Sequence, residues 1–328
     1  MPGRRESRKD KWRVQYAIEA RSLQKRFGDK LAVRDIDLVA REGEILGFLG
    51  QNGAGKTTTI RMILGILSPD AGQCEVLGSR RPLEIAHRIG YLPEERGLYP
   101  AMTTRDTIAF MGALRGLPLA DGRRRAAELL ERYQLGAEVD AKIRTLSKGM
   151  AQKVQLLGSF VHEPDLIILD EPFSGLDPVN QQALEDIISV QRQRGATILF
   201  STHIMGHAER LCDRLVVIAG GQTRFTGSVA EARGVLPAVG ALLAERPVPA
   251  GLLPGDAYRA EGGEWRFSVP DDGVDRLLRA LLDADVGIRD FSVERPTLHD
   301  AFVAMVGDPE AEDARRDAAV DAPAGEVL

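Results

Sequence analysis

Cysteine and long apolar runs are both scarce in this 328-residue sequence. Cys74 and Cys212 each stand alone, which excludes a disulfide framework or a paired-cysteine metal site and suits a reducing compartment. No apolar stretch reaches the roughly 18 to 20 residues of a membrane-spanning helix, so we expect no spanning segment. The basic stretch 4–13 is followed by Glu19 and Arg21 rather than by an apolar core, so we expect no secretory signal.

The composition favours an ordinary globular protein. The chain is 44% hydrophobic and 28% charged, which allows a large core and excludes disorder or a collagen-like fold for the chain as a whole. The net charge of -5 argues against a protein that mainly coats nucleic acid. At about 150 residues per domain, the length fits two domains.

Residues 17–227 alternate short β-branched runs with longer helical patterns, which is typical of a mainly parallel sheet with helices on its faces. The alternation stops over residues 97–146, where a helical insert is expected. The expected buried strands are Glu44–Leu49, Leu166–Leu169, Thr197–Phe200 and Leu215–Ala219. The expected helices of the insert are Thr104–Leu114 and Arg123–Tyr133.

The remaining segments divide the chain further. We expect a basic flexible arm over residues 1–16, a first domain over 17–230 and a Pro- and Gly-rich linker over 231–254. Residues 255–307 predict a small α+β domain, and residues 308–328 an acidic solvated tail. The elements of the small α+β domain would be strands at 265–269 and 286–293 and helices at 274–284 and 297–306. We expect the last helix to pack on its own sheet rather than in a partner's groove.

Residues 50–57 read Gly-Gln-Asn-Gly-Ala-Gly-Lys-Thr, between an apolar strand at Ile45–Leu49 and a helical run at Thr58–Leu67. This order is typical of a phosphate-binding loop and is not expected of a chance glycine turn. The glycines let backbone N–H groups converge on phosphate oxygens at the positive end of a helix. We expect Lys56 to reach the β and γ phosphates and the Thr57 hydroxyl to ligate magnesium.

A second signal is the acid pair Asp170 and Glu171, which ends the buried strand Leu166–Leu169. Ligands of parallel sheets bind at the carboxyl ends of the strands. Two such acids alone also fit a strand that leaves the core. Beside the phosphate loop, they predict that Asp170 holds the magnesium shell and that Glu171 faces an attacking water.

Two further residues follow the same logic. His203 comes directly after the expected strand Thr197–Phe200 and Ser201-Thr202, and alone it would be read as structural or solvated. Because its strand follows the acid pair, we expect it to contact the γ phosphate or the water. Ser147 opens a helix 23 residues before Asp170, where an N-cap is the simplest interpretation.

With the Gly175-Leu176-Asp177 segment, these motifs make residues 17–227 resemble the ATPase subunit of the ATP-binding cassette (ABC) family. The motifs occur in the family's order and spacing. The resemblance implies an α/β P-loop NTPase cassette with a mainly parallel sheet and a helical subdomain, plus a small α+β C-terminal domain. It also implies ATP and Mg²⁺ as cofactors.

The resemblance assigns a role to each motif. Asp170 and Glu171 match the Walker B magnesium acid and the catalytic carboxylate, and His203 matches the switch histidine. Phe27 matches the aromatic residue that stacks on adenine. The matched Walker A residues that would contact nucleotide are Gly50, Asn52, Gly53, Gly55, Lys56, Thr57 and Thr58. The residues that would contact the nucleotide of an opposite protomer are Ser147 and Gly149 of the signature motif, and Asp177 belongs to the D-loop.

Three positions depart from the common pattern. Lys148 and Met150 stand where the signature usually has Gly and Gln, and Glu94 stands where the Q-loop has Gln. An ionised Glu94 accepts hydrogen bonds but does not donate them, so it would contact magnesium or water differently from an amide. The departures resemble exporter subunits of the ABC-2 type, including sodium-extrusion and drug-resistance ATPases. Their extra C-terminal domain resembles residues 286–307 of this chain.

The family resemblance implies a subunit that dimerises around MgATP and powers export. Its partners would be a polytopic membrane permease and a second ATPase subunit, with no nucleic acid, at the cytoplasmic inner face of the cell membrane. The alternative is a soluble ABC-type factor acting on a ribosome or nucleic-acid complex, which we would expect to carry two cassettes or a coiled-coil insertion. A nonhydrolytic sensor, motivated by Glu94 and Lys148, is a third interpretation.

Overall fold

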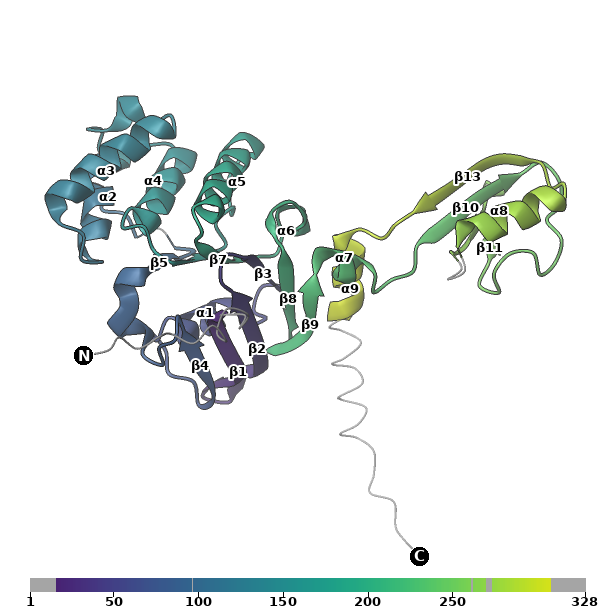
Figure 1. Cartoon of the computed structure of the whole chain (residues 1–328), viewed down its shortest axis with the longest axis horizontal. Helices are drawn as coiled ribbons and strands as arrows, with labels where there is room; N and C mark the ends of the chain where they lie inside the picture. Colours follow the sequence, from purple (N-terminus) through teal and green to yellow (C-terminus); the bar gives the residue numbers. More distant parts are fainter. Residues whose placement is uncertain (1–15, 96, 261, 270–272, 308–328) are drawn as a thin grey trace, which may run out of the picture. The chain divides into compact units, whose positions relative to one another are not determined.

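The computed structural model describes residues 16–95, 97–260, 262–269 and 273–307. The chain divides into two compact units, residues 1–228 and 229–328 (Figure 1). Apart from Tyr16, the expected basic arm over residues 1–16 lies outside the described residues, and so does the expected acidic tail over 308–328.

Within the described residues, the first unit is built on a nine-stranded sheet in the order β4-β1-β2-β9-β8-β3-β7-β6-β5. The first strands are β1 (Tyr16–Phe27), β2 (Lys30–Arg41), β3 (Ile45–Leu49), β4 (Ala71–Val76) and β5 (Ile89–Leu92). The later strands are β6 (Leu166–Asp170), β7 (Thr197–Thr202), β8 (Arg214–Ala219) and β9 (Gln222–Ser228). The stretch β8-β3-β7-β6-β5 is parallel, whereas β1 pairs antiparallel with β2 and β4. The four strands expected from apolar runs are confirmed.

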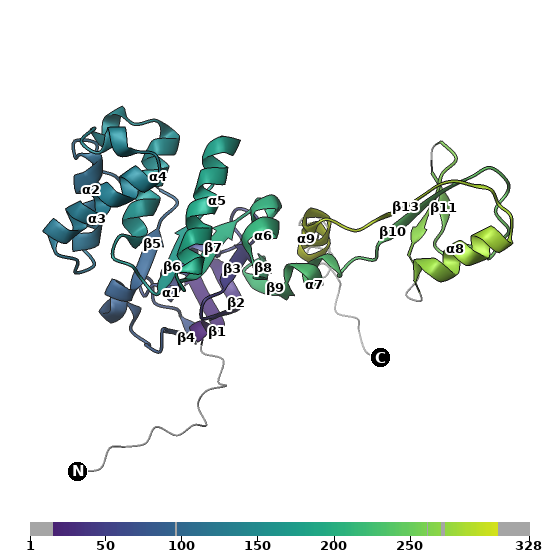
Figure 2. The same cartoon turned by 45° about the horizontal axis from the view of Figure 1, so that its top comes forward.

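Helices cover both faces of this sheet. They are α1 (Lys56–Ile63), α2 (Thr104–Ala113), α3 (Leu119–Arg132), α4 (Lys148–Phe160), α5 (Pro178–Gln193) and α6 (Met205–Leu211). Neighbouring residues of β6 point to opposite faces, as a strand requires: Ile167 packs in the core shared with α4 and α5, and Ile168 in the core shared with α1. Helices α2 and α3 lie within residues 97–146, where a helical insert was expected, and α4, which follows these residues, lies beside them (Figures 1 and 2).

Two helix boundaries differ from the expectations. Helix α1 ends at Ile63, four residues earlier than predicted, because Gly65 takes a left-handed backbone with φ of 71°. Helix α3 begins at Leu119 rather than Arg123. Helix α2 begins where expected, since the Thr103 hydroxyl accepts a hydrogen bond from the Asp106 backbone N–H.

The second unit contains, among its described residues, a four-stranded sheet in the order β11-β12-β10-β13. Its elements are α7 (Val229–Arg233), β10 (Val239–Ala244), β11 (Tyr258–Arg259), β12 (Trp265–Ser268), α8 (Val274–Asp283), β13 (Ile288–Glu294) and α9 (Leu298–Val306). Helix α8 buries Leu277 and Leu281 in a core with Leu242 and Phe267.

This unit differs from the sequence expectation in two ways. Residues 231–254 are not only a linker, because they contain β10, which pairs antiparallel with both β12 and β13. Helix α9 was expected to pack on its own sheet, but it packs against α7 (Figures 1 and 2). The Arg233 side chain of α7 donates a hydrogen bond to the Pro296 carbonyl, just before α9.

Candidate nucleotide site

Three neighbouring parallel strands bring the predicted loops to one edge of the sheet. The register pairs Leu49 of β3 with Thr202 of β7, and Ser201 of β7 with Asp170 of β6. The phosphate loop, His203 and Glu171 follow these strand ends directly, and Asp170 is the last residue of β6. The arrangement is the one expected for ligand binding at the carboxyl ends of a parallel sheet.

The phosphate loop has a backbone that only glycine adopts easily. Gly53 and Gly55 have φ of 83° and 106°, and a Cβ atom on Gly55 would lie 2.9 Å from the Ala32 carbonyl oxygen. The Lys56 side chain is 6% exposed and donates to the carbonyls of Gly50 at 2.7 Å and Gln51 at 3.3 Å. These bonds hold the side chain of Lys56, the first residue of α1, against the backbone of the loop.

The acid pair is buried, and each acid faces different partners. Asp170 is 1% exposed; one of its oxygens accepts from the Ser201 hydroxyl at 2.6 Å, and its Oδ2 has no hydrogen-bond partner. Glu171 is 7% exposed and has a left-handed backbone with φ of 49°. Its Oε1 lies 3.2 Å from Lys56 Nζ, and its Oε2 lies 2.9 Å from His203 Nδ1. The Lys56 contact is an ion pair without hydrogen-bond geometry.

An open pocket of about 360 Å³ lies over this loop. Its lining brings together eight of the residues singled out from the sequence, namely Asn52, Gly53, Gly55, Lys56, Thr57, Thr58, Glu94 and Glu171. Lys30 and Ala32 of β2 also line it, and the sequence reading missed both. They carry no local motif, because β2 reaches the pocket through pairing within the sheet.

The other candidate residues lie outside this pocket lining. Phe27 is 50% exposed at the end of β1, with Lys25 Nζ 5.9 Å from its ring centre. Ser147 caps α4 by accepting from the Met150 N–H at 3.2 Å, and Asp177 caps α5 by accepting from the Asn180 N–H at 3.0 Å.

The two capped helix starts lie against each other. A Cβ atom on Gly149 would lie 2.4 Å from the Asn180 side-chain nitrogen, and that amide also donates to Asp177 at 2.6 Å. Asn180 therefore connects the start of α4 with the start of α5. The hydrogen bonds from Asn180 lower the pKa of Asp177, which keeps it ionised.

The site fits a magnesium-bound triphosphate. Asp170 Oδ2 is a buried carboxylate oxygen without a partner, which is costly unless a cation or donor meets it. The first N–H groups of α1 have no partners within the helix and suit phosphate oxygens. In the described part of the chain no group of three or more His, Cys, Asp or Glu side chains is placed to hold a metal. Mg²⁺ would thus need Thr57, water and the phosphates as additional ligands, as it does in phosphate-transfer sites.

The fold and this loop define a P-loop nucleotide-binding ATPase. A family model described as ABC transporter matches residues 33–174. YhaQ of Bacillus subtilis, an ABC transporter ATP-binding protein, is 36% identical over 286 residues, which is 86% of this chain and 96% of that protein. The Nod factor export ATP-binding protein I of Burkholderia lata is 37% identical over 300 residues, 88% of this chain and 97% of that protein.

Solved structures agree. An ATP-binding subunit of an ABC transporter matches with a TM-score of 0.61 and 34% identity, covering 67% of this chain and 92% of that one. The cbiO1 protein of Clostridium perfringens, part of the ABC transporter complex cbiONQ, matches with a TM-score of 0.60 and 26% identity, covering 67% and 91%. This chain belongs to the family of ABC transporter ATP-binding proteins, and it is an ATPase subunit.

Proposed function

We propose that this subunit binds MgATP in the pocket over residues 50–58 and hydrolyses it to power export through a separate membrane permease. The observation that carries the proposal is that Lys56 and His203 both contact the buried Glu171 carboxylate, and that Lys56 and Glu171 line the open pocket. Both relatives reported above are transporter ATP-binding proteins, and one is named for export. They lend no support to a ribosomal or nucleic-acid factor, and family membership does not favour a nonhydrolytic sensor.

Each residue of the site has a proposed task. Lys56 and the α1 N-terminus bind the phosphates, and Phe27 stacks on adenine. Thr57, Asp170 and Glu94 would hold magnesium or its waters, and the bound cation would neutralise phosphate charge.

Glu171 lines the pocket, so its carboxylate can position the attacking water and accept its proton, and its Oε2 faces the His203 ring. Lys56 pairs with the other oxygen and so holds the Glu171 carboxylate in place. His203, which is 45% exposed, is free to turn from Glu171 toward a γ phosphate.

A second ATPase subunit, identical or related, would complete the site. Ser147, Gly149 and Asp177 lie outside the pocket lining, at the linked starts of α4 and α5. In a head-to-tail pair, these residues would face the nucleotide of the partner. ATP would then hold the two subunits together, and hydrolysis would release them.

The permease would dock on residues 94–99 and the helical insert, at the inner face of the cell membrane. Tyr99 is an exposed aromatic residue that packs edge-on against Phe110 of α2, with ring centres 5.7 Å apart. Arg144 donates its backbone N–H to Pro100. Through these contacts, a movement of the segment after β5 would be passed to the insert. Among the described helices, none has the length and apolarity to cross a membrane.

The test is a Glu171→Gln variant of the full chain. We expect it to bind ATP normally, to form a stable ATP-dependent dimer, and to lose hydrolysis by about 100-fold or more, the range lost with a general base. Lys56→Ala should weaken ATP binding itself. Glu128→Gln removes an exposed carboxylate that pairs with Arg124 of the same helix, and it serves as the control with normal hydrolysis. Normal hydrolysis by Glu171→Gln would refute the assignment.

A further inference from the structure

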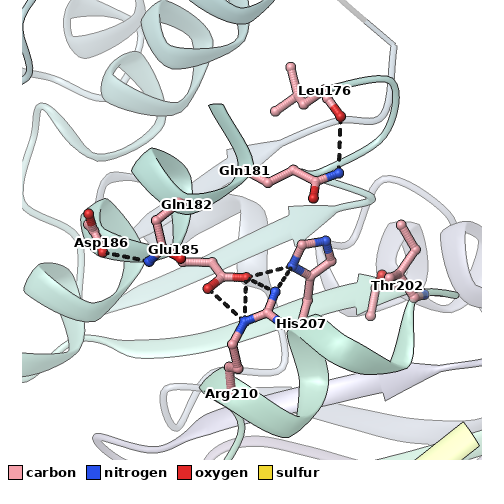
Figure 3. A network of polar contacts seen from close by, with 9 residues as sticks. Leu176, Gln181, Gln182, Glu185, Asp186, Thr202, His207 and Arg210 are labelled. Atoms are coloured by element: carbon pink, nitrogen blue, oxygen red, sulfur yellow. Dashed lines mark hydrogen bonds and ion pairs between the residues drawn. The ribbon is translucent and has the colours of Figure 1, made fainter. Parts of the chain in front are cut away.

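A second polar cluster, with a buried histidine and glutamate and an exposed arginine, lies outside the lining of the nucleotide pocket. We call it the His207 cluster and define it as Phe173, Glu185, His207 and Arg210. His207 is 2% exposed, and its Nδ1 lies 2.6 Å from Glu185 Oε1. Arg210 donates to both Glu185 oxygens, and Figure 3 shows the His207 and Arg210 side chains converging on Glu185. The His207 ring stacks on the Phe173 ring, with centres 3.9 Å apart and planes 13° apart.

The cluster joins the chain segments that follow the proposed catalytic residues. Phe173 comes two residues after Glu171. Glu185 lies in α5, the helix that Asp177 caps. His207 and Arg210 lie in α6, which begins two residues after His203. The cluster therefore joins the segment after Glu171, helix α5 and helix α6 to one another close to Glu171 and His203.

The contacts define the orientation of the His207 ring. The His207 Nδ1 lies 2.6 Å from Glu185 Oε1 and 3.1 Å from Arg210 Nη2, and the shorter contact with a carboxylate oxygen favours the tautomer in which Nδ1 carries the proton and donates to Glu185. Burial raises the pKa of Glu185, but the hydrogen bonds from Arg210 and His207 outweigh it, and the net pKa is lowered. The carboxylate is thus charged and binds the ring firmly. The other ring nitrogen, Nε2, is buried and has no hydrogen-bond partner, so Glu185 is the carboxylate that orients the ring.

The side chain of His203 needs such support. It is 45% exposed, and its ring contacts Glu171 Oε2 at 2.9 Å. The Ile204 N–H donates to the Thr202 hydroxyl at 3.0 Å, so the backbone around His203 is tied to the end of β7. On the other side of His203, the chain enters α6, and the His207 cluster holds α6 against the segment after Glu171.

We propose that His207 is a positioning residue, which through Glu185 and Phe173 sets the distance between His203 and Glu171. The inference rests on the catalytic roles proposed above for those two residues. It predicts that disturbing His207 lowers the rate of hydrolysis while ATP binding is kept, because the phosphate loop belongs to a different segment. A displacement near 1 Å at reacting groups costs up to about 100-fold in rate.

Two substitutions separate the two contacts of His207. His207→Phe keeps a ring against Phe173 and removes the donor to Glu185. His207→Asn keeps a side-chain N–H at the position of Nδ1 and removes the ring. Gln182→Ala is the matched control, since it breaks an exposed hydrogen bond to Asp186 in the same helix that carries Glu185 (Figure 3).

The experiment measures kcat and KM for ATP on the full chain, with thermal unfolding recorded for each protein. We expect His207→Phe to lower kcat by about 10- to 100-fold with KM within about twofold, and Gln182→Ala to match the wild type. His207→Asn should fall between them. Each substitution is then repeated in a His203→Ala background. In that background, the His207 substitution should lower kcat by less than about twofold further, because the side chain that His207 positions has been removed.

The outcomes distinguish the two proposals. Unchanged kcat in both His207 variants, or a rise in KM in place of a fall in kcat, overturns the positioning role. The same fold loss with and without His203 also overturns it, because the cluster would then be only structural. If His203→Ala and Glu171→Gln hydrolyse ATP normally, the proposed site itself is wrong.

Discussion

Ser201 offers a sharp test of how the acid pair is held. Its side chain is fully buried, its hydroxyl donates to Asp170 at 2.6 Å, and it accepts from the Glu171 backbone N–H at 3.0 Å. In Ser201→Ala, Asp170 loses the donor to one oxygen while its other oxygen already has none. A hydrogen bond to a charged group contributes about 1.5–3 kcal/mol, and a buried N–H left unpaired costs about 1 kcal/mol more. We therefore expect the free energy of unfolding to fall by about 3 kcal/mol.

The control is Ser159→Ala, because Ser159 is also buried but donates to a neutral carbonyl, that of Leu156, at 2.7 Å. Its loss should cost about 1 kcal/mol. Urea unfolding without nucleotide measures both. Adding MgATP should recover more stability in Ser201→Ala than the wild type gains, if a cation meets the Asp170 carboxylate. Equal losses for the two serine variants would show that Asp170 does not depend on Ser201, and the reasoning would be refuted.

Two further predictions concern the backbone and the pH response. Gly55→Ala places a Cβ atom 2.9 Å from the Ala32 carbonyl oxygen at a φ of 106°, so it should lower the free energy of unfolding by about 1–3 kcal/mol and weaken ATP binding. Thermal unfolding and an ATP titration measure the two effects. Gly53→Ala, whose Cβ atom would meet no other atom within 4 Å, should cost less. Burial lowers the pKa of His162 to about 4. Between about pH 6.5 and 4, the unfolded chain therefore binds a proton on this side chain and the folded chain does not. Stability should fall as pH drops through that window, by about 1–2 kcal/mol after allowance for solvent exposure, and less in His162→Gln; equal acid sensitivity of the two proteins would contradict this.

The parallel part of the sheet was predictable because its strands are buried on both faces. Leu166–Asp170 reads as an unbroken apolar run that ends in an acid, and no competing helix period fits it. The antiparallel strands β1 and β2 are half exposed and alternate irregularly, with bulges in their pairing. Strand β10 was taken as linker because it lies between Pro237 and Pro247 in a Pro- and Gly-rich stretch. Its identity as a strand comes from its partners β12 and β13.

The site shows the same division between local and long-range information. The phosphate loop and the acid pair each carry their chemistry in adjacent residues, so spacing alone revealed them. Ser201 lies 31 residues from Asp170, and His207 lies 22 residues from Glu185. Neither pair has a local signature, because only the pairing of β6 with β7 and the packing of α5 near α6 bring them together.

Strand β10 determines where the chain can be cut. It lies between β12 and β13 in the sheet, although it precedes both in the sequence. A fragment that ends at residue 254 would keep β10 without either neighbour and would present two unpaired strand edges, which are templates for aggregation. A fragment that ends at Ser228 removes the second unit whole. The expression boundary of an isolated cassette should therefore be set at the end of β9, at Ser228, and not within or after the Pro-rich segment 231–254.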